Sequence, residues 1–191
     1  MRAAVVLAAG LSRRMGTDKL LLSVEGQPMY RHALRLAAAL TADLRIVVTN
    51  NGQIAQEAET MGFIAVPSPR AAEGMGFSVA AGTAALGAAQ TAVFLNADQP
   101  FLRAETVEVL LETGARTGKI IVPEVDSAPC SPCVFPRRFF PELSMLSGAQ
   151  GGKAVWKCHA EETMLVPCDA ESFCDVDTRE QYARLDSAGR M

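Results

Sequence analysis

The chain has 191 residues, of which 49% are hydrophobic and 20% charged, and it carries a net charge of −3. This composition excludes a disordered chain, and the lack of a basic excess argues against a nucleic-acid-binding protein. The first apolar run breaks at Gly10, which makes it too short for a membrane span and unlike a signal peptide. We therefore expect a single domain over residues 1–191, cytoplasmic, without nucleic-acid or membrane partners.

The chain begins with a candidate phosphate-binding segment. Residues 3–7 form an apolar run typical of a buried strand, and the small residues 8–10 follow it. Their backbone amides can approach crowded phosphate oxygens, while Arg13, Arg14 and Lys19 are long enough to reach the outer phosphates. A plain strand and loop with solvated arginines is the alternative, and the segment is not a Walker A loop.

The spacing in this segment resembles a known family signature. The matching residues are Leu7-Ala8-Ala9-Gly10-x-Ser12-x-Arg14-Met15-Gly16-x-x-Lys19. The pattern is similar to that of nucleotidyltransferases with a Rossmann-like, glycosyltransferase-A-type fold, and most of all to the molybdenum cofactor cytidylyltransferases and guanylyltransferases, the MobA-like NTP transferases. The resemblance implies a three-layer α/β fold with a mostly parallel sheet.

The rest of the chain alternates between strand and helix patterns. In chain order we predict a strand at 3–7, a helix at 29–40, a strand at 44–48, a helix at 54–61, a strand at 63–66, a helix at 78–86, a strand at 92–95, a helix at 103–116, and strands at 119–122 and 164–167 before a final helix from 177. Connections of this length allow crossovers, so the pattern itself predicts a mostly parallel sheet covered on both faces.

A glycine-containing loop at 71–78 leads into the predicted helix at 78–86. Its pattern is similar to the G-M-x-x-S element with which family members hold the nucleotide. The resemblance therefore makes Gly74, Met75 and Ser78 candidates to border the base or the ribose, whereas the residues alone indicate only a loop.

Asp98 follows the apolar run 92–95. A carboxylate at the carboxyl end of a central parallel strand lies where open α/β sheets bind ligands, so Asp98 is placed to hold a divalent cation. It also suits the cap of a following helix. Asp98-Gln99-Pro100 resembles the metal-binding motif of the molybdopterin branch.

The segment 132–143 resembles the family element that lines the acceptor pocket, and Arg137 and Arg138 are candidates to meet a pterin phosphate or are plain surface residues. This region departs from the family pattern. Relatives usually carry Gly in place of Cys130, and Gly-Asp-x-Gly-Ala-Arg in place of the Gly-Ala-Gln-Gly-Gly-Lys at 148–153. Lys153 does not reproduce the two-pronged hydrogen bonding of Arg, so the departures bear on the acceptor more than on the nucleotide.

Five cysteines, an odd number, favour reduced thiols over a disulfide framework. Cys130 and Cys133 have C-x-x-C spacing, and the nearest candidate partners are Cys158 and His159. No second pair follows at zinc-ribbon distance, so we expect unligated thiols, with a zinc site as the alternative.

The run Asp175-Val176-Asp177-Thr178 resembles the closing motif of the family, in which an acidic side chain joins the cation site. The resemblance implies Asp177 as the second metal ligand, with Asp175 in reserve. Asp177 also suits a helix cap.

Taken together, these motifs give a candidate site for Mg²⁺ and a nucleoside triphosphate. The catalytic candidates are Arg14, Lys19 and Asp98, and the metal candidates are Asp98 and Asp177. The nucleotide-binding candidates are Leu7, Ala8, Ala9, Gly10, Ser12, Arg14, Lys19, Gly74, Met75 and Ser78.

The implied reaction transfers CMP from CTP to the phosphate of molybdopterin and releases pyrophosphate. The acceptor phosphate is already ionised, so positioning and electrostatics suffice. In the family that this chain resembles, guanylyl enzymes carry Gly where this chain has Ala9, so we hypothesise that its methyl group favours CTP over GTP. The alternatives are a same-fold transferase that uses GTP or a sugar-phosphate acceptor, and a non-catalytic molybdenum cofactor carrier or chaperone. A molybdoenzyme or its chaperone is a further possible partner.

Overall fold

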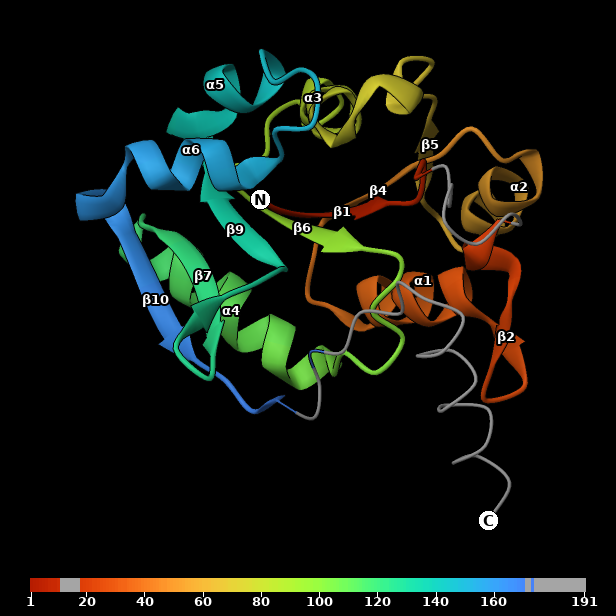
Figure 1. The fold of residues 1–191 in the computed structure, drawn as a ribbon, viewed down its shortest axis with the longest axis horizontal. Helices are drawn as coiled ribbons and strands as arrows, with labels where there is room; N and C mark the ends of the chain where they lie inside the picture. Colours follow the sequence, from red (N-terminus) through yellow and green to blue (C-terminus); the bar gives the residue numbers. More distant parts are fainter. Residues whose placement is uncertain (11–17, 171–172, 174–191) are drawn as a thin grey trace.

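The structure, a computed structural model, describes residues 1–10, 18–170 and 173. Its main sheet consists of β1 (Arg2–Leu7), β4 (Leu44–Val48), β5 (Ile64–Val66), β6 (Thr91–Asn96), β7 (Ile120–Val125), β8 (Ala128–Pro129), β9 (Cys133–Pro136) and β10 (Thr163–Pro167) (Figure 1). A separate two-stranded sheet consists of β2 (Ser23–Val24) and β3 (Gln27–Pro28).

Six α-helices and four short 3₁₀ helices are present in these residues. The α-helices are α1 (Met29–Ala39), α2 (Gly52–Thr60), α3 (Met75–Ala84), α4 (Ala104–Thr117), α5 (Phe140–Ser144) and α6 (Gly152–Cys158). The 3₁₀ helices are η1 (Lys19–Leu21), η2 (Ala71–Glu73), η3 (Arg137–Phe139) and η4 (Ala160–Glu162). None of the helices described is long and apolar enough to cross a membrane.

The main sheet has the strand order β10-β7-β9-β6-β1-β4-β5, with β8 paired to β7 outside this path. Strand β1 is parallel to β4 and β6, β4 is parallel to β5, and β7 is parallel to β10. Only β9 runs antiparallel within this path, against both β6 and β7. The prediction of an α/β fold with a mostly parallel sheet is therefore confirmed.

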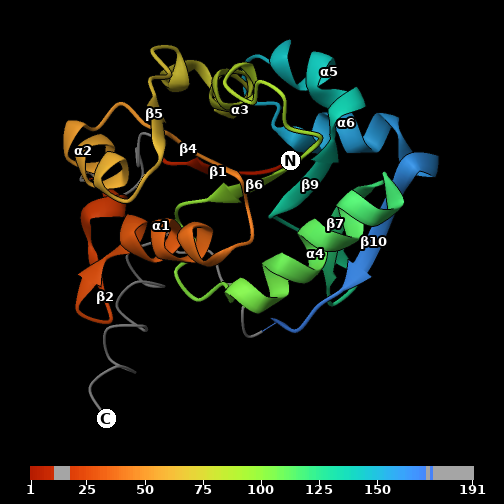
Figure 2. The same ribbon diagram turned by 180° about the vertical axis from the view of Figure 1, so that it is seen from behind.

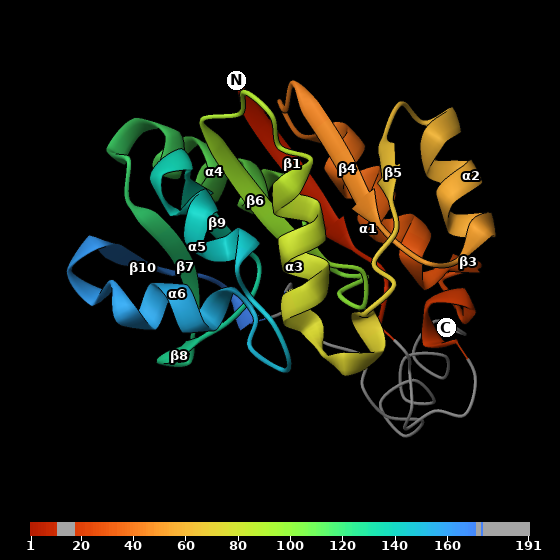
Figure 3. The ribbon, with the colours of Figure 1, turned by 90° about the horizontal axis from the view of Figure 1, so that it is seen from above.

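Helices cover both faces of the sheet, which forms the middle of three layers. Figure 2 shows α1 and α4 on one face, and Figure 3 shows α3, α5 and α6 on the other. Within β1, Ala4 and Val6 belong to the core under α1 and α4, whereas Ala3 and Val5 belong to the core under α3. Successive strand residues point to opposite faces, so a strand buried on both sides needs an uninterrupted apolar run.

The region after Pro123 differs from the sequence prediction. Strand β7 continues through Pro123 to Val125, beyond the predicted end at residue 122, and forms a hairpin with β8. The carbonyl of Pro123 accepts a hydrogen bond from the Cys130 amide at 2.9 Å. Strand β9, which the pattern did not predict, is buried at all four of its residues because it lies in the middle of the sheet.

Helix α3 begins at Met75, three residues before the predicted start at Ser78. Gly74 precedes it with φ +143°, a backbone conformation that side-chain-bearing residues rarely adopt. The predicted final helix from Asp177 lies outside the described residues.

Candidate active site

Lys19 and Asp98 form an ion pair at the carboxyl end of the central strands. Lys19 begins η1, and Asp98 follows β6 by two residues. Lys19 Nζ lies 2.7 Å from Asp98 Oδ2, and the two side chains are only 14% and 22% exposed. Because low exposure weakens solvent screening, this pair interacts more strongly than a surface ion pair does.

Two residues that the sequence analysis did not single out position Lys19. Asp18 Oδ1 accepts a hydrogen bond from the Leu20 amide at 3.2 Å, and Asp18 Oδ2 accepts one from Asn51 Nδ2 at 3.1 Å. Asn51 also caps α2, since its Oδ1 accepts from the Gln53 amide at 3.0 Å. The sequence did hold a signal for both, because Asp and Asn directly before a helix are typical caps.

A cavity of about 250 Å³ lies beside this ion pair. Its lining residues come from the ends of β1 and β6, from η1, and from the start of α3: Leu7, Ala9, Gly10, Lys19, Leu20, Ala71, Met75, Ser78, Asn96, Ala97 and Asp98. Ala8 is not among them, because its amide donates to the Val48 carbonyl at 2.8 Å and its side chain is buried. The Ala8 amide is therefore engaged in the sheet.

The residues of the predicted nucleotide-binding element at 74–78 do not all lie at the first cavity. Met75 and Ser78 line the cavity, and Ser78 Oγ donates to Ser68 Oγ at 3.3 Å. Gly74 packs elsewhere: a Cβ placed there would lie 1.9 Å from the Gly148 carbonyl oxygen. Gly74 thus allows the start of α3 to contact the loop before α6.

Asp98 also has the chemistry expected of a cation ligand. Its Oδ1 is buried and has no hydrogen-bond partner among the described residues. A buried carboxylate oxygen without a partner is costly, and hard divalent cations prefer such oxygens. The residues described contain no group of three His, Cys, Asp or Glu side chains arranged to hold a metal. Asp98 therefore suits a cation that takes its other ligands from a substrate or from residues that the structure does not describe. Three of the predicted site residues, Ser12, Arg14 and Asp177, lie outside the described residues.

A second cavity of about 410 Å³ adjoins the first. It is lined by Leu7, Met75, Val79, Phe94, Asn96, Pro129, Cys130, Ser131, Cys133, Phe135, Ala149, Gly151, Gly152, Lys153 and Trp156. Most of these residues come from β6, β9, α6 and the loops beside them. A Cβ at Gly152 would lie 2.9 Å from Phe135 Cζ, so a glycine there lets α6 approach β9 closely.

Arg137 and Arg138 do not line this cavity. Arg137 donates to the carbonyl oxygens of Gly87 and Ala89, at 2.9 Å and 3.0 Å. Arg138 pairs with Glu162 at 2.6 Å and donates to the Gly118 carbonyl. Both arginines tie surface segments together, which agrees with the alternative that they are plain surface residues.

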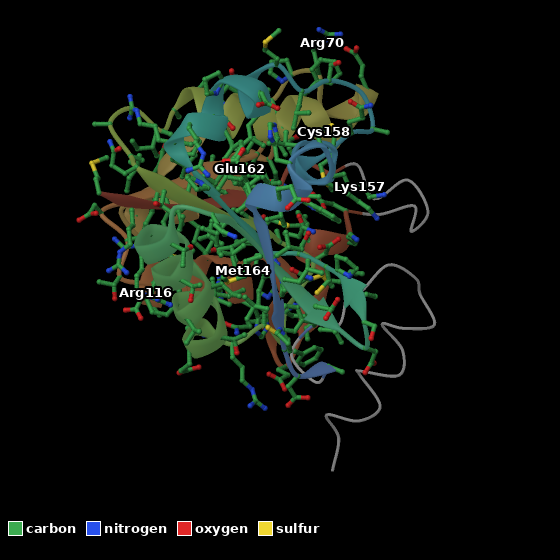
Figure 4. All side chains as sticks on the ribbon, turned by 90° about the vertical axis from the view of Figure 1, so that its left-hand side faces the viewer. Arg70, Arg116, Lys157, Cys158, Glu162 and Met164 are labelled. Carbon is green, nitrogen blue, oxygen red and sulfur yellow. The ribbon has the colours of Figure 1, made fainter. Side chains whose placement is uncertain are left out.

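None of the described cysteines, Cys130, Cys133, Cys158 and Cys168, forms a disulfide with another described cysteine. Burial raises the pKa of the Cys133 thiol to about 12, so it remains protonated. Cys158 is exposed on α6, next to Lys157 in Figure 4. His159 Nε2 lies 2.9 Å from Glu142 Oε1, and this part of the chain offers no zinc site.

Small residues, a lysine and a carboxylate thus surround a cavity at the carboxyl ends of parallel strands, and this fold and site define the class of the α/β nucleotidyltransferases. The sequence profile of the MobA-like NTP transferase domain matches residues 4–169. The chain belongs to that family, as the sequence signature implied.

Two named relatives show how far the sequence similarity extends. The purine catabolism protein PucB of Bacillus subtilis (strain 168) is 29% identical over 191 residues, covering 93% of this chain and 92% of PucB. The bifunctional protein GlmU of Acidovorax sp. (strain JS42) is 33% identical over 123 residues, covering 58% of this chain. That match covers 25% of GlmU, so the chain spans about a quarter of this longer relative.

Solved structures are similar over nearly the whole chain. Rv0371c from Mycobacterium tuberculosis H37Rv is 28% identical, with a TM-score of 0.80 and 96% of each chain covered. A structure of Rv0371c in complex with manganese matches with 27% identity and a TM-score of 0.75, covering 96% of this chain and 97% of that one. A related protein therefore binds a divalent metal.

Proposed function

We propose that this protein transfers CMP from CTP to the terminal phosphate of molybdopterin, with Mg²⁺ as cofactor and pyrophosphate as the second product. The observation that carries this proposal is the largely buried Lys19–Asp98 pair, in which Asp98 Oδ1 has no hydrogen-bond partner among the described residues, beside a cavity that shares lining residues with a second cavity. A triphosphate has the negative charge that Lys19 can neutralise. The second cavity then offers room for an acceptor beside it.

In the proposed reaction an oxygen of the acceptor phosphate forms a bond to the α-phosphorus of CTP. The bond between the α-phosphorus and the bridging oxygen breaks, and its electron pair leaves with pyrophosphate. No proton has to be removed from the acceptor, because its phosphate is already ionised. Lys19 neutralises charge on the leaving group, and Arg14 is proposed to do the same. Asp98, with Asp177, would hold Mg²⁺, which when bound screens the charge of the phosphates.

The lining of the second cavity supports a planar, anionic acceptor. Phe135 and Trp156 supply aromatic surface, and Lys153 supplies a positive charge. Aromatic side chains pack well against flat heterocycles, and a lysine beside them suits a phosphate. This combination favours a pterin phosphate over a sugar phosphate.

The preference for CTP rests on Ala9, which lines the first cavity and is only 6% exposed. Its methyl group narrows the space available to the base. A narrower pocket favours a pyrimidine over a purine, although one methyl group gives limited discrimination.

The test is a pyrophosphate-release assay with Mg²⁺, each of the four triphosphates, and molybdopterin or a series of sugar phosphates. We expect release with CTP and molybdopterin, and none with heat-denatured protein. If pyrophosphate is released with a sugar phosphate but not with molybdopterin, the proposed acceptor is wrong. If GTP is used in preference to CTP, the proposed nucleotide is wrong.

A non-catalytic carrier or chaperone is the second candidate, and the departures Cys130, Ala149 and Lys153 at the second cavity are what favour it. It predicts molybdopterin binding without pyrophosphate release. In either case we propose that the protein acts in the cytoplasm and delivers the cofactor to a molybdoenzyme or its chaperone.

A further inference from the structure

The two cavities share part of their walls. Leu7, Met75 and Asn96 are the residues common to both linings in the described part of the chain. Asn96 alone among these three has a polar side chain. If one cavity holds the triphosphate and the other the acceptor, the phosphates that react meet at this shared boundary.

The sheet fixes the position of Asn96. It is the last residue of β6 and lies opposite Leu7 in the parallel pairing with β1. The next amide, that of Ala97, donates to the Leu7 carbonyl at 3.1 Å, so the ladder continues past Asn96. Its side chain therefore projects from ordered backbone.

The alternation of β6 places Asn96 on the face that carries both cavities. Phe94, two residues earlier, belongs to the core under α3 and α6, whereas Leu95 belongs to the opposite core. Residues two apart in a strand share a face. Asn96 therefore lies on the same face as Phe94, between α3 and α6, and only two residues before Asp98.

The two asparagines that follow β4 are hydrogen-bonded to other described residues, and the Asn96 side chain is not. Asn50 exchanges two hydrogen bonds with the Ser68 backbone, at 2.8 Å and 2.9 Å. Asn51 binds Asp18 and caps α2. The partly buried Asn96 side chain makes no hydrogen bond to another described residue, so its amide group is available to a ligand.

We propose that Asn96 is a catalytic residue whose Nδ2 donates a hydrogen bond to a non-bridging oxygen of the α-phosphate during attack by the acceptor phosphate. This inference rests on the proposed function. The amide donates without transferring a proton, while the new oxygen–phosphorus bond forms and the electron pair of the breaking bond leaves with pyrophosphate. A neutral donor suits this position because negative charge gathers on the phosphoryl oxygens in the transition state.

The kinetic test compares Asn96→Ala with the wild-type protein. We expect kcat for pyrophosphate release to fall about 100-fold, the usual cost of one such donor, with the KM values for CTP and molybdopterin within threefold. Asn96→Asp should fall further, because a carboxylate repels both phosphates. The matched control is Gln90→Ala, which removes an exposed amide just before the other end of β6 and should leave kcat unchanged.

A second measurement needs no acceptor. The ³¹P NMR spectrum of bound α,β-methylene-CTP with Mg²⁺ should show a displaced α-phosphorus resonance in Asn96→Ala and an unchanged γ resonance, with Kd within threefold of wild type. Unchanged kcat and an unchanged α resonance would overturn the role of Asn96, as would a loss of folding stability without either effect.

These outcomes separate the two proposals. If the wild-type protein binds the analogue but releases no pyrophosphate with any acceptor, the proposed function fails while the α resonance still decides the role of Asn96. If the wild-type protein binds no nucleotide at all, both proposals fall.

Discussion

The two cavities differ in the kind of residue that forms them. The first is formed by parallel strands, small side chains and the Lys19–Asp98 pair, in the region that carries the family signature. The second has β9, the antiparallel strand of the main path, together with aromatic side chains from β9 and α6. It also contains the departures Cys130, Ala149 and Lys153. The first cavity is thus defined mainly by charged side chains and the second mainly by the shape of its aromatic lining. The sequence of the second cavity can therefore vary more readily with the ligand that it binds.

The two regions are nevertheless packed against each other at the start of α3. The Gly76 amide donates to the Gly148 carbonyl at 3.0 Å, and a Cβ at Gly76 would lie 2.6 Å from the Gln150 carbonyl oxygen. A displacement of the loop at 147–152 would therefore move Met75, which lines both cavities. The comparison can be tested by changing each region separately and then the contact between them.

The largest effect is expected from Asp98→Asn in the first cavity. The substitution removes the negative charge that pairs with Lys19 and that would hold Mg²⁺, so kcat for pyrophosphate release should fall about 10³-fold. Binding of Mn²⁺ to the protein–CTP complex, followed by electron paramagnetic resonance, should weaken in parallel. Molybdopterin affinity should not change.

The control for that substitution is Asp126→Asn in the turn between β7 and β8. Asp126 has φ +49°, which Asn also tolerates, and it lines neither cavity. If Asp98→Asn is as active as this control, the proposal that the first cavity binds the metal and the triphosphate is contradicted.

Gly74→Ala tests the contact between the two regions. The new Cβ would meet the Gly148 carbonyl oxygen at 1.9 Å, and φ is +143°, so the free energy of unfolding should fall by about 3 kcal/mol. Urea denaturation measures the loss, and binding of both substrates should weaken together. Gly87→Ala, with φ +52° and no atom within 4 Å, should cost only about 1 kcal/mol.

Lys153→Met tests the second cavity alone. Removing its charge should raise the KM for molybdopterin about 10-fold, because one charge-assisted contact to the phosphate is lost, while the KM for CTP stays the same. Steady-state kinetics with each substrate varied in turn measures both. The matched control is Lys157→Met, one turn further along α6 and exposed in Figure 4. Equal effects of the two substitutions would show that Lys153 acts through general charge only.

Ala9→Gly tests base selection in the first cavity. Without the methyl group, the ratio of kcat/KM for CTP to that for GTP should fall by roughly 10-fold, the scale for one methyl group in a pocket. Ala65→Gly removes the same group from β5 and should leave the ratio unchanged. If Ala9→Gly leaves the ratio unchanged, a residue other than Ala9 selects the base.

The smallest effect concerns a network that lines neither cavity. Glu57 on α2 accepts hydrogen bonds from Arg31 Nε and Tyr30 Oη, each at 2.5 Å. The Arg31 guanidinium is the main cause that lowers the pKa of the Glu57 carboxyl in the folded state. The ionised Glu57 carboxyl therefore contributes its full stabilisation above the unfolded-state pKa of about 4.3. This stabilisation is lost as the pH falls through the lower pKa that Glu57 has in the folded state.

Glu57→Gln should make the unfolding free energy less dependent on pH in the acid range below the unfolded-state pKa of about 4.3, at a cost of about 1 kcal/mol at neutral pH. Urea denaturation at a series of pH values measures this, and kcat should not change. Glu59→Gln, exposed on the same helix, is the control and should keep the slope of the wild-type protein. A change in kcat for Glu57→Gln would show that α2 is coupled to the first cavity.

The local pattern predicted the two strands that end at the first cavity, but it did not predict η1 and it placed the start of α3 three residues late. The apolar runs at 3–7 and 92–95 lie within β1 and β6, and α1 and α4 agree with their predictions to within one residue. These elements have strong periodicity or continuous burial, so a short window of sequence suffices. Strand β9 and helix α6 were not predicted as elements, because four apolar residues between prolines and a glycine-rich start give weak local signals.

By itself, the sequence determined the α/β class and the placement of a carboxylate and a lysine after apolar strands, because polarity and spacing along the chain define both. Only the tertiary structure decided which polar groups have partners: the Ala8 amide is engaged by Val48, Arg137 by two carbonyl oxygens, and Asp98 Oδ1 by no described residue. It also decided that the two cavities meet at Asn96. Such partnerships join residues far apart in the chain, and no local pattern records them.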